Sequence, residues 1–233
     1  GKLLYPWLRP LLRARLRYAS RKIVTVDMLQ QHLAIRLKTI LDQTTDGYSF
    51  SGLSGLENDK SYVFMSNHRD IALDPAITVL GLVESGRDSL RIAIGDNLLS
   101  KPFASDLMRI NRSFIVKRSV VARREKLKAL KILSHYIRQS VCNEGISIWI
   151  AQAEGRAKDG KDRTETALLK MLALSRSKDQ DFSSAINELN IVPVSISYEY
   201  DPCDADKARE LYIAKTGKSY VQTASEDLDT RKK

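Results

Sequence analysis

The most constraining feature of this chain is the alternation of short strand-like runs with helix-like segments between residues 62 and 196. The runs are rich in β-branched and aromatic residues, at Tyr62–Met65, Leu90–Ile94, Ser113–Val116, Ile146–Ile150 and Ile191–Ile196. Helical patterns lie between them at Pro75–Val83, Phe103–Met108, Val121–Val141 and Thr164–Leu174. Strands and helices that take turns along a chain are typical of an α/β fold. We therefore predict a central mixed sheet flanked by helices.

The N-terminal residues predict a basic amphipathic helix. Arginines and lysines fall between apolar positions that recur at helical spacing, and Pro10 suits the first turn of a helix. Such a helix fits a membrane interface, although a helix packed on the domain would have a similar pattern. The apolar positions are Leu3, Leu4, Trp7, Leu8, Leu11, Leu12 and Leu16.

Composition divides the chain into three parts. Residues 1–46 are assigned to the N-terminal helical segment, which includes a second helical stretch before a Gly-rich region. Residues 47–215 are assigned to the main α/β domain, and residues 216–233 to a polar tail that we expect to be frayed. A chain of 233 residues is long enough for one such domain with a sizeable core.

The strongest bulk signal is the formal net charge of +10. It favours anionic partners, which include nucleic acid, anionic lipid headgroups and acidic proteins. No run approaches the roughly 18 apolar residues of a membrane-spanning helix, so we expect a soluble or membrane-surface protein. Cys142 and Cys203 lie far apart without metal-like spacing, which favours free thiols in a reducing cytoplasm.

The helical segment Val121–Val141 combines an apolar stripe with a dense set of cations. Leu127, Leu130, Leu133, Ile137 and Val141 form the stripe, and Arg123, Arg124, Lys128, Lys131 and Arg138 occupy much of the remainder. This pattern fits a solvated helix face. It also fits a docking surface for acidic headgroups or an acidic carrier.

His68 is the leading candidate for chemistry. The run Tyr62–Met65 brings it to the end of a strand, where open α/β sheets usually bind ligands. A histidine there can act as a general base if a carboxylate fixes its tautomer, and Asp70 and Asp74 are the candidates. An aspartate before Pro75 is also a natural helix cap, and one carboxylate can serve both purposes.

Four blocks, taken in order, resemble the glycerolipid acyltransferase superfamily over roughly residues 51–200. Five residues separate His68 from Asp74, one more than is usual in that family, and Arg156 follows Gly155 directly. The blocks are Asn67-His68 with Asp74, Phe114-Ile115-Val116-Lys117-Arg118, Glu154-Gly155-Arg156, and the run from Ile191 to Glu199 that contains Pro193.

The resemblance implies acyl transfer in phospholipid biosynthesis. The acyl donor would be a thioester, either acyl-CoA or an acylated acyl-carrier protein. The acceptor would be a hydroxyl of glycerol 3-phosphate or lysophosphatidic acid. His68 would be the general base, with Asp74 as its orienting partner and Asp70 as the alternative partner. Backbone N–H groups near the helix opened by Pro75 would stabilise the developing oxyanion.

The resemblance also implies a site for the acceptor phosphate. Its residues are Arg118, Lys117, Glu154, Gly155 and Arg156. Arginine suits this task because its guanidinium makes bidentate contacts with phosphate. No metal and no cofactor are expected, apart from the acyl donor as co-substrate.

We expect a cytoplasmic protein, peripheral at the inner face of the membrane, with no nucleic-acid partner. The alternative from another class is a non-enzymatic basic module that binds nucleic acid or anionic lipid. That alternative accounts for the charge, but it does not account for a histidine followed by two aspartates at a strand end.

Overall fold

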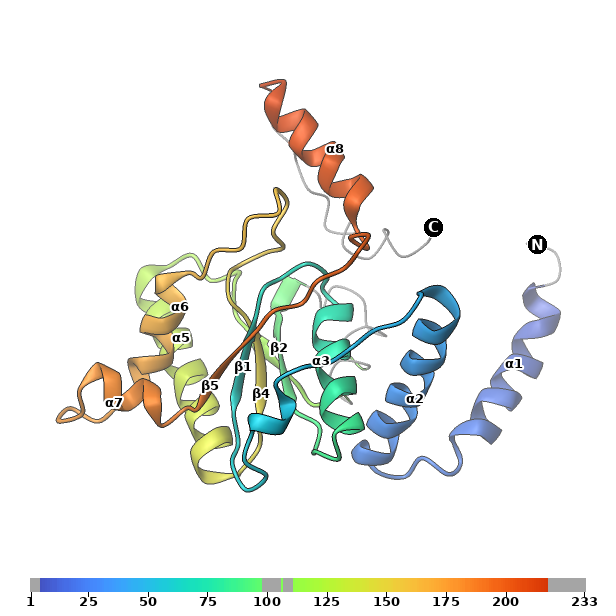
Figure 1. Cartoon of the computed structure of the whole chain (residues 1–233), viewed down its shortest axis with the longest axis horizontal. Helices are drawn as coiled ribbons and strands as arrows, with labels where there is room; N and C mark the ends of the chain where they lie inside the picture. The colour runs from blue at the N-terminus through green and yellow to red at the C-terminus, as the bar shows by residue number, and fades with distance from the viewer. Residues whose placement is uncertain (1–4, 98–105, 107–110, 218–233) are drawn as a thin grey trace.

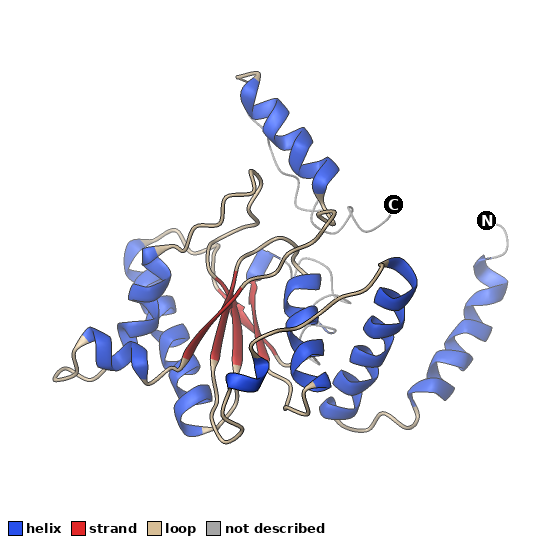
Figure 2. Cartoon of the chain, viewed as in Figure 1, coloured by secondary structure: helices blue, strands red, loops and turns tan. Residues whose placement is uncertain are grey.

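The computed structural model describes residues 5–97, 106 and 111–217, and its centre is one five-stranded sheet. The strands, red in Figure 2, are β1 (Val63–Ser66), β2 (Arg91–Gly95), β3 (Ser113–Val116), β4 (Ile148–Ala151) and β5 (Ile191–Val194). Their order is β3-β2-β4-β1-β5. The predicted α/β class is confirmed. The expected mixture of strand directions is not found, because every strand pair in the described sheet is parallel.

Helical crossovers explain the parallel arrangement. The chain passes from β1 to β2 through α3 (Leu73–Glu84), and from β3 to β4 through α5 (Arg123–Arg138). It passes from β4 to β5 through α6 (Thr166–Leu172) and α7 (Phe182–Asn187). Each crossover returns the chain to the same edge of the sheet, so the next strand runs in the same direction.

Helices cover both faces of the sheet. Figure 1 shows α5, α6 and α7 on one side and α3 on the other, with α2 (Val26–Thr44) outside α3 and α1 (Tyr5–Ser20) beyond α2. The last described helix, α8 (Asp204–Lys215), lies above the end of the sheet where the strands finish. The predicted helix Phe103–Met108 lies outside the described residues except for Asp106, and so does the tail beyond residue 217. Short helical turns occur at Leu53–Gly55, Gln139–Asn143 and Ala173–Ser175.

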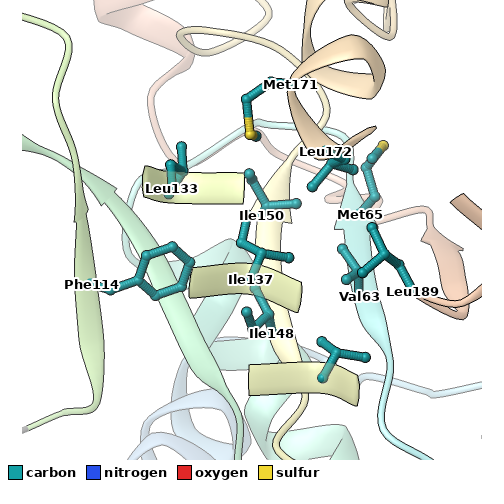
Figure 3. Close-up of a cluster of buried hydrophobic side chains, with 11 residues drawn as sticks. Val63, Met65, Phe114, Leu133, Ile137, Ile148, Ile150, Met171, Leu172 and Leu189 are labelled. Carbon is teal, nitrogen blue, oxygen red and sulfur yellow. The ribbon is translucent and has the colours of Figure 1, made fainter. Parts of the chain in front are cut away.

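Strand side chains alternate between two apolar layers. Val63 and Met65 of β1 point into the cluster between the sheet and α5, where they meet Ile137 and Leu172 (Figure 3). Phe64, the residue between them, belongs to the cluster on the α3 face. This alternation follows from the two-residue period of a strand. It explains why the strand-like runs are almost continuously apolar, since parallel strands are buried on both faces.

The N-terminal helix differs from the expectation in one respect. Pro10 lies inside α1 and not in its first turn, so α1 lacks the hydrogen bond that this residue would otherwise donate. The side chains of Leu11, Leu12 and Leu16 are each more than half exposed, at 68%, 57% and 60%. Among the described helices, none combines the length and the apolar character needed to cross a bilayer.

Candidate active site

His68 lies just beyond the carboxyl end of β1, in a segment anchored on two sides. The side-chain amide of Asn67 donates to the carbonyl of Ile196 (2.9 Å) and its oxygen accepts from the Ile196 N–H (2.8 Å). The N–H of Ala157, in the segment after β4, donates to the carbonyl of His68 (2.8 Å). The histidine is therefore held by the segments that follow both neighbours of β1.

Asp74 is the carboxylate paired with His68. Its Oδ2 lies 3.0 Å from Nδ1 of His68 and also accepts the N–H groups of Arg69 (2.7 Å) and Asp70 (2.9 Å). Asp74 is fully buried in the first turn of α3, where side chains point back toward the preceding segment. A carboxylate at Nδ1 selects the tautomer that carries the proton there, which leaves Nε2 able to accept one.

Asp70 performs the capping role that the sequence left open for Asp74. Its Oδ1 accepts the N–H groups of Ala72 and Leu73, both at 2.7 Å, at the start of α3. Helix α3 begins at Leu73, so Asp74 is already helical and its side chain is directed to His68. The longer spacing from His68 to Asp74 thus accommodates a turn that Asp70 stabilises.

The same contacts engage four of the backbone N–H groups near the helix opened by Pro75. The N–H groups of Arg69 and Asp70 donate to Asp74, and those of Ala72 and Leu73 donate to Asp70. These four backbone donors near the start of α3 are therefore already engaged. They do not form the open donor pair that a developing oxyanion requires.

Tyr198 completes the environment of Asp74 and was not singled out from the sequence. Its hydroxyl donates to Oδ1 of Asp74 (2.9 Å), the carboxylate oxygen that does not face His68. Burial, and then the charge of Asp74, raise the pKa of Tyr198, so the hydroxyl stays protonated as a donor. The signal in the sequence that could have identified it is its place in the fourth motif block, the run from Ile191 to Glu199.

Arg118 lies at the ends of β2 and β3. Asp96 accepts the backbone N–H of Arg118 (3.1 Å), the N–H of Ser119 (3.2 Å) and the Ser119 hydroxyl (2.5 Å). Burial raises the pKa of Asp96, but the hydrogen bonds from Ser119 and Arg118 outweigh it and the net shift is downward. Asp96 thus remains a charged anchor for the segment that carries Arg118.

Gly95 makes room for the Arg118 side chain. A Cβ at Gly95 would lie 2.3 Å from Oδ1 of Asn97 and 3.1 Å from Nε of Arg118, both closer than such contacts normally allow. The guanidinium that crosses this position lies 3.9 Å from Oε1 of Glu154, in the segment after β4. The structure therefore brings together Arg118 and Glu154, two residues of the predicted phosphate site. Gly95 provides space for the Arg118 side chain, and the sequence patterns did not reveal this role.

The remaining residues of the predicted phosphate site follow β3 and β4 at the carboxyl edge of the sheet. Arg156 donates to the Sγ of Cys203 (3.0 Å), whose thiol also contacts Asp70 (3.3 Å). Burial, reinforced by the charge of Asp70, raises the pKa of Cys203 to about 11.

Two further residues of the predicted phosphate site lie near Arg156 and Arg118 in the sequence. Gly155 adopts a φ of +83°, which favours glycine, and the Lys117 side chain is exposed. Arg156 thus lies beside the segment that carries Asp70, and Arg118 lies beside Glu154.

Helix α8 braces the His68 segment across a hollow of about 440 Å³. Lys207 is buried, and its ammonium donates to the carbonyl of Arg69 (2.9 Å) and to Asp201 (2.5 Å). Arg69 pairs in turn with Asp162 at 2.7 Å. The hollow is lined by these ion pairs and by Ser197 and Tyr198, so its cations are largely neutralised.

Comparison with known proteins identifies the class of this chain. The family model described as Acyltransferase matches residues 48–197, which is more than half of the chain. The chain therefore belongs to the acyltransferase family. This confirms the assignment of the chain as an acyltransferase, and hence as an enzyme.

The chain is also similar to a solved structure along most of its length. It is the crystal structure of the 1-acyl-sn-glycerophosphate (LPA) acyltransferase PlsC from Thermotoga maritima, at 12% sequence identity. The match covers 94% of this chain and 96% of that one, with a TM-score of 0.43. No curated protein sequence matches significantly.

The contact between Tyr198 and Asp74 yields a prediction for stability. Tyr198→Phe removes the donor to Oδ1 and leaves part of a buried carboxylate unsatisfied, so the free energy of unfolding should fall by about 1–3 kcal/mol. Urea denaturation followed by circular dichroism measures the change. Tyr212→Phe on α8 is the matched control, because that side chain is 70% exposed and should change little. Equal effects of the two substitutions would contradict a specific role for the hydroxyl.

Proposed function

We propose that this protein transfers a fatty acyl group from a thioester to a hydroxyl of a phosphate-bearing glycerol acceptor, either glycerol 3-phosphate or lysophosphatidic acid. The observation that carries the proposal is the buried pair of His68 and Asp74 at the carboxyl edge of the sheet, in a chain that belongs to the acyltransferase family. The product would be an acylated glycerol phosphate, and the role would be in phospholipid biosynthesis.

In the proposed reaction, Nε2 of His68 removes the proton of the acceptor hydroxyl as its oxygen attacks the thioester carbonyl. An oxygen–carbon bond forms, the carbonyl becomes tetrahedral, and the carbon–sulfur bond then breaks. The departing thiolate takes up the proton from the imidazolium, so atoms and charge balance. Asp74 stabilises the imidazolium through Nδ1, and its own position depends on Tyr198 and on the N–H groups of Arg69 and Asp70.

The acceptor phosphate is assigned to the cations beside the His68 segment. Arg118 is the principal candidate, because its guanidinium lies at a strand end and Glu154 orients it from 3.9 Å. Arg156 and Lys117 complete the proposed site, and Gly155 provides the turn between Glu154 and Arg156. The donor serves as a co-substrate, acyl-CoA or an acyl-carrier protein, and the proposed chemistry requires no metal.

We also propose that the enzyme works at the inner face of a membrane as a peripheral cytoplasmic protein. Support comes from α1, where the exposed Leu11, Leu12 and Leu16 lie among Arg13, Arg15 and Arg17. Apolar side chains would enter the interface while arginines contact anionic headgroups. A long-chain acceptor that resides in that membrane would then be near the catalytic edge.

The catalytic assignment is tested by substituting each member of the pair. His68→Ala should lower kcat by roughly 10²–10⁴-fold or more, because the general base is lost. Asp74→Asn should lower kcat by at least about 10²-fold, because an amide neither stabilises the imidazolium nor fixes the tautomer. Turnover is followed by the release of free thiol from the donor.

Asp70→Asn is the matched control for Asp74→Asn. It removes the same charge from the same segment, but the carboxylate of Asp70 accepts from the backbone amides of Ala72 and Leu73 and from the Cys203 thiol, so kcat should fall less than about tenfold. Circular dichroism checks that each variant is folded. Near-normal turnover in folded His68→Ala protein would exclude the mechanism, and a larger loss for Asp70→Asn would reverse the roles of the two aspartates.

Arg118→Ala tests the phosphate site. Loss of a charge-assisted contact costs roughly 1.5–3 kcal/mol, so the acceptor KM should rise about 10- to 100-fold while the donor KM stays within about twofold. Gly95→Ala should produce the same pattern more weakly, because the added methyl group crowds the side chains of both Asn97 and Arg118. Equal changes in both KM values would count against this role.

Membrane contact is tested with Leu12→Glu/Leu16→Glu, a pair of exposed substitutions within α1. Binding to anionic phospholipid vesicles in a sedimentation assay should fall at least about tenfold, because apolar burial is replaced by repulsion. Turnover of a water-soluble short-chain donor should stay within about twofold. Tyr212→Glu, which also adds charge at an exposed apolar residue, is the control. Unchanged vesicle binding by the α1 variant would place the membrane contact elsewhere.

A further inference from the structure

We propose that the outer face of α5 is the docking surface for an acidic acyl-carrier protein, which delivers the thioester to this enzyme. The surface, called the α5 stripe below, consists of Arg124, Lys128 and Lys131. This inference rests on the proposed function and goes further, because it selects between the two donors that the proposed reaction allows.

The α5 stripe is a continuous row of positive charge. Its residues are spaced four and three positions apart, so they lie along one face of the helix. All three are exposed, whereas Leu133 and Ile137 on the opposite face are buried against the sheet. In the part of the chain that the structure describes, no acidic side chain forms an ion pair with the stripe. Its charge is therefore available to a partner.

Exposed apolar side chains flank the stripe and favour a partner that is both apolar and acidic over a nucleic acid. Leu127 is 48% exposed and Ile132 is 60% exposed, and each lies next in sequence to a lysine of the stripe. Apolar contacts surrounded by charge are the composition of a protein interface. An amphipathic helix with regularly spaced carboxylates would satisfy both kinds of side chain, whereas a phosphate backbone would use only the cations.

The location of the stripe suits a carrier protein that approaches from the side away from the membrane. Helix α5 begins at Arg123, five residues after Arg118, so its first turns lie toward the catalytic edge of the sheet. Figure 1 shows α5 on the face of the sheet opposite to α3, α2 and α1. If α1 rests on a membrane, the stripe lies on the far side of the molecule from that membrane. A carrier bound there could extend its flexible prosthetic arm over the edge toward His68.

Charge reversal on the stripe tests the proposal. Lys128→Glu/Lys131→Glu is compared with Arg36→Glu/Lys178→Glu, which makes the same change of charge at exposed positions outside the stripe. Steady-state kcat/KM is measured without vesicles, at low salt, with one acceptor and two donors that carry the same acyl chain, acyl-carrier protein and acyl-CoA. The stripe variant should lose about 10- to 100-fold with the carrier and at most about twofold with acyl-CoA. The control should change at most about twofold with either donor.

The possible outcomes separate this inference from the proposed function. Equal losses with both donors, or no loss with the carrier, would overturn the docking surface. So would a loss of vesicle or RNA binding by the stripe variant with unchanged carrier kinetics. Wild-type turnover of acyl-CoA but not of the carrier would overturn it while the proposed function stands. Turnover of neither donor by the wild-type enzyme would overturn the proposed function itself.

Discussion

The buried carboxylate of Asp74 is the interaction on which the candidate site depends. A charge removed from water is costly unless every lone pair is used, and here the carboxylate is contacted by His68, two backbone N–H groups and the Tyr198 hydroxyl. These donors come from the segment after β1 and from the segment after β5. Removal of any one donor therefore disturbs more than its own contact, because the others share the same acceptor.

The two aspartates illustrate how one short segment separates structural and chemical tasks. Asp70 uses its carboxylate to satisfy the first amides of α3, and this leaves Asp74 to face the imidazole. If Asp74 were the helix cap, its oxygens would be turned toward backbone amides of α3 instead of His68. The capping by Asp70 thus allows a carboxylate on a helix to act as an orienting group. The additional residue between His68 and Asp74 belongs to this turn.

Local patterns in the sequence predicted most of the strands and helices but not the contacts between distant segments. The run Ser113–Val116 was predicted with its observed bounds, and Tyr62–Met65 differs from β1 by one residue at each end, because strand periodicity is a local property. Strand direction was missed, since it depends on crossovers. Tyr198, Gly95 and Lys207 were missed for a similar reason: their importance arises from partners far away in the sequence, namely Asp74, Arg118 and Arg69. The roles assigned to Arg118 and Arg156 stay predictions.

The position of Tyr198 and α8 bears on where this domain can be cut. The family match ends at residue 197, one residue before Tyr198, and a fragment trimmed to that limit would omit Tyr198, Cys203 and Lys207. It would retain the first three motif blocks and most of the fourth, and yet it would lack the donors to Oδ1 of Asp74 and to the carbonyl of Arg69. The end of the family match therefore falls inside the supporting structure of this site, and a fragment that keeps all of these contacts has to extend at least to Lys207.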